Sequence, residues 1–105
     1  MDKTTINSAI DFLKSSLIKS GINVDSIALF GSAKNGTFTS ESDIDLMIIS
    51  SDFINLDIFE RAKLTMKPET ETLRKFKIPM DIINLSPEEF EKPEIKFYYN
   101  PQIVA

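Results

Sequence analysis

The sequence contains no cysteine and no histidine among its 105 residues. Disulfide bonds and the common zinc sites are excluded, because the side chains that form them are missing. The same absence excludes Ser–His and Cys–His nucleophile pairs and histidine acid–base chemistry. Any catalysis must therefore use carboxylates, hydroxyls, lysines, arginines, backbone groups and a metal ion held by oxygen ligands.

The chain also lacks a dense basic cluster and a long apolar run. Its 12 basic and 16 acidic residues give a formal net charge of −4, whereas a protein that neutralises nucleic-acid phosphates is expected to carry a basic patch. No window approaches the roughly 18 apolar residues of a membrane helix, and the N-terminal segment has no continuous apolar stretch of the signal-peptide kind. We therefore expect a cytoplasmic protein with neither a nucleic-acid nor a membrane partner.

The composition is otherwise that of a globular protein, with 42% hydrophobic and 27% charged residues. A chain of this length is expected to form one domain over residues 1–105. An amphipathic helix is predicted over residues 4–20, ended by Gly21. Short apolar runs predict strands over residues 26–30, 43–50 and 78–85, and residues 31–42 are expected to form a loop or a single helical turn. The side chains expected on the buried face of the first helix are those of Ile6, Ala9, Ile10, Leu13, Leu17 and Ile18.

The second half of the chain predicts further helices around the third strand. Residues 54–76 have a helical pattern, in which Pro68 is expected to break the helix or to open a second one. Ser86 followed by Glu89 is a capping-box pattern that begins a short helix, and the tail is expected to add another short helix and an edge strand. The element order α-β-β-α-β-α predicts an α/β (α+β) fold with a small mixed sheet and helices packed on it. Three aromatic residues of the tail are expected to pack on the core or the sheet edge, with a partner surface as the alternative: Phe97, Tyr98 and Tyr99.

Three aspartates interrupt apolar strand patterns. Asp43 and Asp45 are two residues apart, so their carboxylates leave the same face of a strand. Asp81 lies in the third predicted strand and joins them if that strand is the neighbour. Two carboxylates 4 Å apart repel by about 4 kcal/mol at an effective dielectric constant of 20. A Mg²⁺ ion, which prefers carboxylate, water and phosphate oxygens, would offset that repulsion.

A Gly-Ser pair follows the first predicted strand. Gly31 would allow the backbone to approach a ligand closely, and Ser32 would offer a hydroxyl. If the residues after Gly31 form one helical turn, their free N–H groups make an anion site suited to phosphates. Phosphates and a metal ion at adjacent strand ends are what a nucleoside triphosphate requires.

The spacing of these residues resembles the signature of the DNA polymerase β-like nucleotidyltransferase superfamily. Gly31 and Ser32 are followed, after ten residues, by Asp43 and Asp45, and "SDIDLMI" is similar to the minimal nucleotidyltransferase (MNT) domains of HEPN/MNT antitoxins. The likeness covers residues 6 to about 90 and implies a polymerase β palm-like fold. It also implies that Asp43 and Asp45 bind Mg²⁺, that Asp81 is a metal ligand or base, and that Gly31 and Ser32 hold the triphosphate.

One position departs from the pattern of the small members. Many of them carry arginine after the Gly-Ser pair, whereas here Ala33 is followed by Lys34. Lys34 can take over as a point charge on the phosphates, so it is the third expected nucleotide-binding residue.

The resemblance implies a Mg²⁺-dependent transfer of a nucleoside monophosphate, AMP from ATP, to a hydroxyl acceptor. Small relatives are antitoxins that adenylylate a tyrosine of a HEPN-domain RNase toxin, so a toxin protein is the expected partner, with a homo-oligomer as the alternative. A different interpretation is a catalytically weak nucleotide-binding module that neutralises or regulates its partner by contact. A third is a nucleotidyltransferase acting on a small molecule such as an antibiotic.

Overall fold

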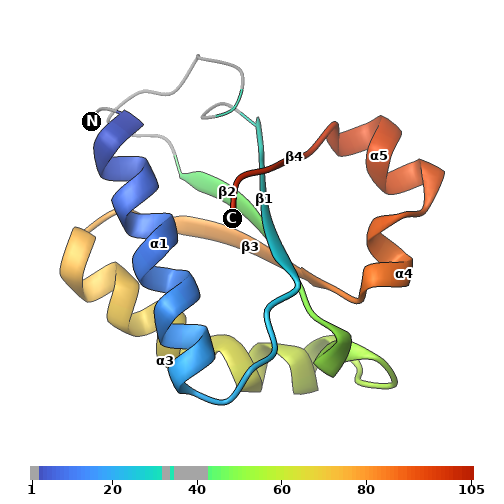
Figure 1. Cartoon of the computed structure of the whole chain (residues 1–105), viewed down its shortest axis with the longest axis horizontal. Helices are drawn as coiled ribbons and strands as arrows, with labels where there is room; N and C mark the ends of the chain where they lie inside the picture. Colours follow the sequence, from blue (N-terminus) through green and yellow to red (C-terminus); the bar gives the residue numbers. More distant parts are fainter. Residues whose placement is uncertain (1–2, 32–33, 35–42) are drawn as a thin grey trace.

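The computed structural model describes residues 3–31, 34 and 43–105 (Figure 1). Within these residues the chain forms helices on both sides of a four-stranded sheet, which confirms the predicted α/β fold with helices packed on a small mixed sheet. The helices are α1 (Lys3–Lys19), α3 (Ile58–Phe76), α4 (Pro87–Phe90) and α5 (Pro93–Tyr99), with a short 3-10 turn at Ser51–Phe53. The strands are β1 (Ser26–Phe30), β2 (Ile44–Ile49), β3 (Met80–Leu85) and β4 (Gln102–Ile103). None of the described helices is both long and apolar enough to cross a membrane.

The sheet has the strand order β3-β2-β1-β4 and is mixed. β1 is antiparallel to both β2 and β4, whereas β2 and β3 are parallel and are joined through α3. A parallel pair needs such a crossover, because its second strand must begin at the same end as the first. The two-residue strand β4 confirms the edge strand expected near the C-terminus.

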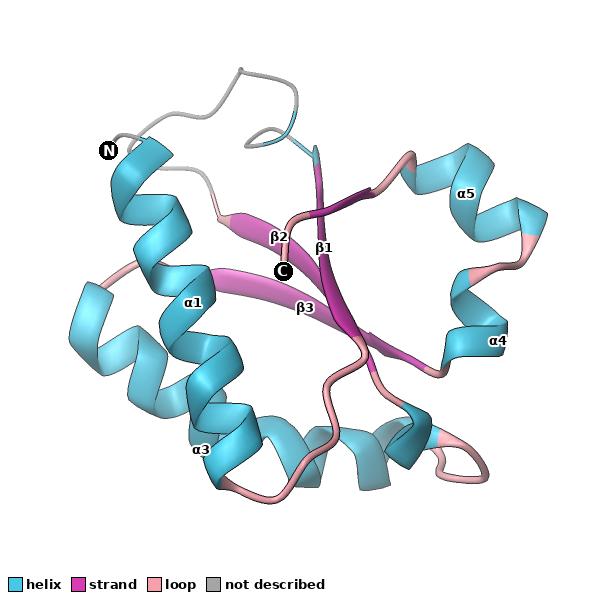
Figure 2. Ribbon diagram, in the orientation of Figure 1, coloured by secondary structure: helices cyan, strands magenta, loops and turns pink. Residues whose placement is uncertain are grey.

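Two apolar cores cover the two faces of the sheet. α1 packs on one face, where Leu13 and Leu17 meet Leu46 and Ile48 of β2. The other face carries Met47 and is covered by α4 and α5, at the opposite side of the molecule from α1 and α3 (Figure 2). The alternation expected along β2 is therefore confirmed, and nearly all of this central strand is buried on both faces. The half-buried Asp45 is its one charged member.

α1 confirms the first predicted helix, and Gly21 follows it with φ +90°. Of the side chains expected on its buried face, Ile18 is wrong, because it is 55% exposed. Consecutive helical residues point about 100° apart, so Ile18 is carried off the face that includes Leu17.

Pro68 does not break the second long helix, so that expectation was wrong. α3 runs uninterrupted from Ile58 to Phe76 and begins at a capping box between Asp57 and Glu60. Pro68 belongs to the buried side of α3, and the Thr72 hydroxyl donates a hydrogen bond to its carbonyl at 2.8 Å. Burial of the ring offsets a cost of roughly 3 kcal/mol for proline inside a helix.

The C-terminal aromatics divide into one packed and two exposed side chains. Tyr99 is half-buried and packs edge-to-face on Phe30, with ring centroids 5.1 Å apart. Phe97 and Tyr98 are 93% and 80% exposed, so the expectation that they pack was wrong for both. The capping box between Ser86 and Glu89 is confirmed at the start of α4.

Candidate active site

The pairing of β2 with its two neighbours brings the strand aspartates together. Asp45 lies opposite Asp81 of β3 and opposite Phe30 of β1, on the same face of the sheet. Asp43 lies two residues before Asp45, at the point where the chain enters β2. Two of the three aspartates singled out in the sequence are therefore direct cross-strand neighbours.

Gly31 packs directly against the Asp45 carboxylate. A Cβ atom at position 31 would overlap the carboxylate oxygen Oδ2 and would lie 2.9 Å from Cγ. The backbone of Gly31 also has φ +73°, a conformation that side-chain-bearing residues rarely adopt. Glycine is required here for both reasons, because it lets the strand end of β1 approach the carboxylate.

Electrostatic repulsion acts within this group of acids. Burial raises the pKa of Asp45 above its ordinary value, and the negative charges of Asp81 and then Asp43 raise it further. Both effects disfavour the ionised carboxylate. A cation bound beside Asp45 would offset both effects, and carboxylate oxygens are the type of ligand that a hard ion such as Mg²⁺ prefers.

The remaining predicted site residues are placed only in part. Lys34 has helical backbone, as a helical turn after β1 requires, whereas Gly31 has a positive φ and Ser32 lies outside the described residues. Among residues 3–31, 34 and 43–105, no three acidic side chains lie close enough to enclose a metal ion. The metal roles of Asp43, Asp45 and Asp81 stay predictions, as do the nucleotide contacts of Gly31, Ser32 and Lys34.

Sequence reasoning missed that an aromatic side chain, Phe30, lies beside the carboxylates. Phe30 is the cross-strand neighbour of Asp45, and Tyr99 of α5 covers the Phe30 ring. In the sequence Phe30 is only the last apolar residue of a strand. Its place beside Asp45 follows from the β1–β2 register, which no local pattern carries.

Comparison with known proteins identifies the family of the chain and a structure with the same fold. The family model of the nucleotidyltransferase domain matches residues 6–102, which include Gly31 and all three aspartates. A crystal structure of a protein from Sulfolobus solfataricus, provisionally assigned as a nucleotidyltransferase, aligns with a TM-score of 0.61 and 21% sequence identity. The alignment covers 98% of this chain and 87% of that chain, and at this identity it shows a shared fold. No curated protein matches the sequence. Because the family model spans almost all of the sequence, the chain belongs to the nucleotidyltransferase domain family.

Proposed function

We propose that the chain is a Mg²⁺-dependent enzyme that transfers AMP from ATP to a hydroxyl acceptor, with residues 1–105 acting as one domain. The observation that carries this proposal is the juxtaposition of Asp45, Asp81 and Gly31. Asp45 and Asp81 are cross-strand neighbours on β2 and β3, and a glycine with positive φ keeps side-chain atoms away from the Asp45 carboxylate.

Asp43 and Asp45 would hold the metal ion, with Asp81 as a further ligand or as the base. Bound Mg²⁺ would supply neutralisation of the triphosphate charge. The transfer forms a bond between the acceptor oxygen and the α-phosphorus of ATP and breaks the bond from that phosphorus to pyrophosphate. The acceptor proton goes to a carboxylate, for which Asp81 is the candidate because it is exposed and next to Asp45.

Other groups would position the nucleotide. Gly31, Ser32 and Lys34 would hold its phosphates just after the end of β1. Phe30 and Tyr99 form an apolar boundary on the same face as Asp45, which would limit the access of water from that side.

For the acceptor we propose a tyrosine of a HEPN-domain RNase toxin, so that the chain acts as an antitoxin. This part rests on the similarity of the segment around Asp43 and Asp45 to small members of the family. The alternative of a catalytically weak module that neutralises a partner by contact is favoured by one observation, Ala33 in place of an arginine.

One labelling experiment separates these functions. The purified chain would be incubated with Mg²⁺, ATP labelled on the α-phosphate and a HEPN protein encoded beside it. We expect label on a tyrosine of the partner, and loss of at least about a hundredfold in rate for Asp45→Asn. The matched control is Asp11→Asn, which removes an exposed carboxylate from α1 on the opposite face of the sheet. No transfer by the wild type, or unchanged transfer by Asp45→Asn, would contradict the enzymatic proposal.

A further inference from the structure

α3 carries an apolar stripe that faces away from the core. Its buried side is made by Thr65, Pro68 and Thr72. Phe59, Met66 and Leu73, spaced seven residues apart, are 75%, 60% and 44% exposed. Residues seven apart lie on the same side of a helix, so these three form a stripe about four turns long. A surface stripe of large apolar side chains is typical of an interaction site.

A hollow runs beside this stripe, between α3 and the edge strand β3. Its volume is about 330 Å³, and its apolar lining includes Met66 and Leu73 of α3 and Met80 and Ile82 of β3. This volume is within the range of sites that accept a group the size of a small ligand or a few side chains. The stripe and the hollow together form one groove, which we call the α3–β3 groove.

Two polar side chains line the groove. The Asn84 side-chain oxygen Oδ1 is buried and accepts no hydrogen bond among the described residues. Glu69 also lines the hollow; burial raises the pKa of its carboxyl, and a hydrogen bond with the Thr65 side chain acts in the opposite direction. Buried acceptors are normally paired, so Asn84 Oδ1 is a polar atom of the groove floor that the described residues leave without a donor.

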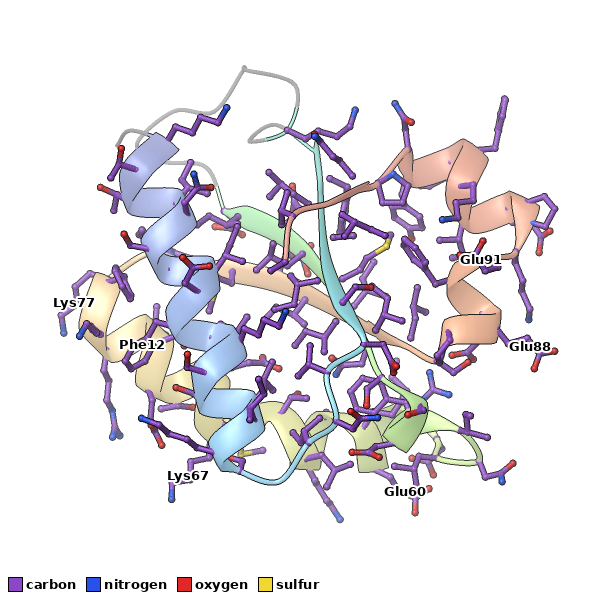
Figure 3. The ribbon with its side chains drawn as sticks, viewed as in Figure 1. Phe12, Glu60, Lys67, Lys77, Glu88 and Glu91 are labelled. Carbon is purple, nitrogen blue, oxygen red and sulfur yellow. The ribbon has the colours of Figure 1, made fainter. Side chains whose placement is uncertain are left out.

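A basic ridge borders the other side of the stripe. Lys63, Lys67 and Arg74 lie next to Met66 along the outer side of α3, with Glu71 among them. The two salt bridges among the described residues, Arg61–Glu89 and Lys96–Glu91, do not involve them. Figure 3 shows Lys67 pointing outward from α3. With Glu71 counted, the ridge still has a net positive charge, on a chain whose formal net charge is −4.

These features select one kind of occupant. A flat lipid surface cannot fill a concave hollow. A second copy packed antiparallel through α3 would bring the same flank of each helix together, so the basic ridges would repel each other. We propose that the α3–β3 groove binds an amphipathic helix of a partner protein, with its apolar face in the hollow and acidic residues along the ridge.

The groove lies on the far side of the sheet from the aspartates. Ile82 lines the groove, whereas the adjacent Asp81 points to the opposite face with Asp45. A partner helix docked on α3 therefore leaves the carboxylates uncovered. Binding of a partner helix in the α3–β3 groove does not depend on the proposed transfer reaction.

Synthetic helical peptides added to the full chain test the proposal. The first carries a leucine stripe flanked by glutamates, the second has the same stripe flanked by lysines, and the third replaces the leucines of the first with serines. Fluorescence anisotropy would measure the dissociation constants. We expect the acidic peptide to bind at least about tenfold more tightly than the basic one, because its glutamates can form exposed ion pairs with Lys63, Lys67 and Arg74. The serine peptide should not bind, because it has no apolar face.

Surface variants locate the binding. Met66→Asp should abolish binding of the acidic peptide, and Lys67→Glu should weaken it several-fold. Ile18→Asp is the matched control, because Ile18 is a 55% exposed apolar residue on α1, and binding should be unchanged. Circular dichroism would check that each variant folds.

Four outcomes would overturn the proposal. They are equal binding of the acidic and basic peptides, absence of binding by both, binding that survives Met66→Asp, and amide chemical-shift changes that fall outside α3 and β3. Two further measurements test the other occupants. Sedimentation showing a dimer that Met66→Asp dissociates would assign the groove to a second copy, and Met66-dependent binding to phosphatidylglycerol vesicles would assign it to a membrane.

Discussion

Replacement of Gly31 by alanine tests the close contact on which the site depends. Two separate effects are expected to lower the free energy of unfolding. The positive φ of +73° costs an alanine roughly 1–2 kcal/mol. The new Cβ also overlaps the Asp45 carboxylate, and relieving such an overlap costs typically about 1–3 kcal/mol. We expect Gly31→Ala to lower the free energy of unfolding by roughly 2–5 kcal/mol.

Gly21 provides a matched control for the backbone cost. It has φ +90°, and a Cβ there would meet no atom within 4 Å. Gly21→Ala should therefore lose only the roughly 1–2 kcal/mol of backbone strain. Urea denaturation of both variants and the wild type measures the difference, which isolates the overlap at Gly31.

A double-mutant cycle assigns that difference to Asp45. In an Asp45→Ala background the carboxylate is gone, so Gly31→Ala should cost about as much as Gly21→Ala. Calorimetric titration of Mg²⁺ and a non-hydrolysable ATP analogue should show that Gly31→Ala loses binding and Gly21→Ala keeps it. The reasoning is refuted if the two glycine variants are destabilised equally, or if the cost of Gly31→Ala is the same with and without the Asp45 carboxylate.

Three further predictions concern charge and packing. The pKa of Asp45 is raised in the folded state, so the folded protein holds this proton more tightly than the unfolded chain does. The stability of the wild type should therefore fall as pH rises from the unfolded pKa of Asp45 to its folded pKa. In thermal unfolding, Asp45→Asn should show neither this decline nor the stabilisation by Mg²⁺ expected for the wild type. The hydrogen bonds from Arg61 hold the pKa of Glu89 below its ordinary value, so this contribution is present above an unfolded pKa of about 4.3 and is lost as pH falls through the folded pKa. Glu89→Gln should therefore lose about 1–2 kcal/mol at pH 7 and show a flatter acid limb in urea titrations, and an unchanged acid limb would contradict the assignment. Tyr99→Ala should cost roughly 2 kcal/mol in the same assay because it packs on Phe30, whereas Tyr98→Ala, 80% exposed, should change stability by less than about 0.5 kcal/mol.

The elements that the sequence predicted well are those specified by neighbouring residues. The capping box between Ser86 and Glu89 and the glycine after α1 each act within one turn of a helix. The alternation along β2 likewise follows from the period of two residues in any strand. These signals need no knowledge of the rest of the chain, so the sequence carries them completely.

The elements that the sequence predicted wrongly depend on what packs against them. Pro68 remains inside α3 because its ring is buried, and helix propensity by itself contains no term for that burial. Phe97 and Tyr98 are exposed although their residue type favours a core. The α3–β3 groove was not predicted for the same reason, since the exposure of Met66 depends on how α3 is rotated on the sheet.

The candidate site divides along the same line. By itself the sequence determined which residues are chemically suitable: the spacing of Asp43 and Asp45 places both on one face of a strand, and a glycine follows β1. Only the tertiary structure decided that β3 lies beside β2, so that Asp81 meets Asp45, and that Gly31 touches the Asp45 carboxylate. The physical reason is that side-chain direction along a strand is a local property, whereas strand order and register are set by burial of both sheet faces over the whole chain.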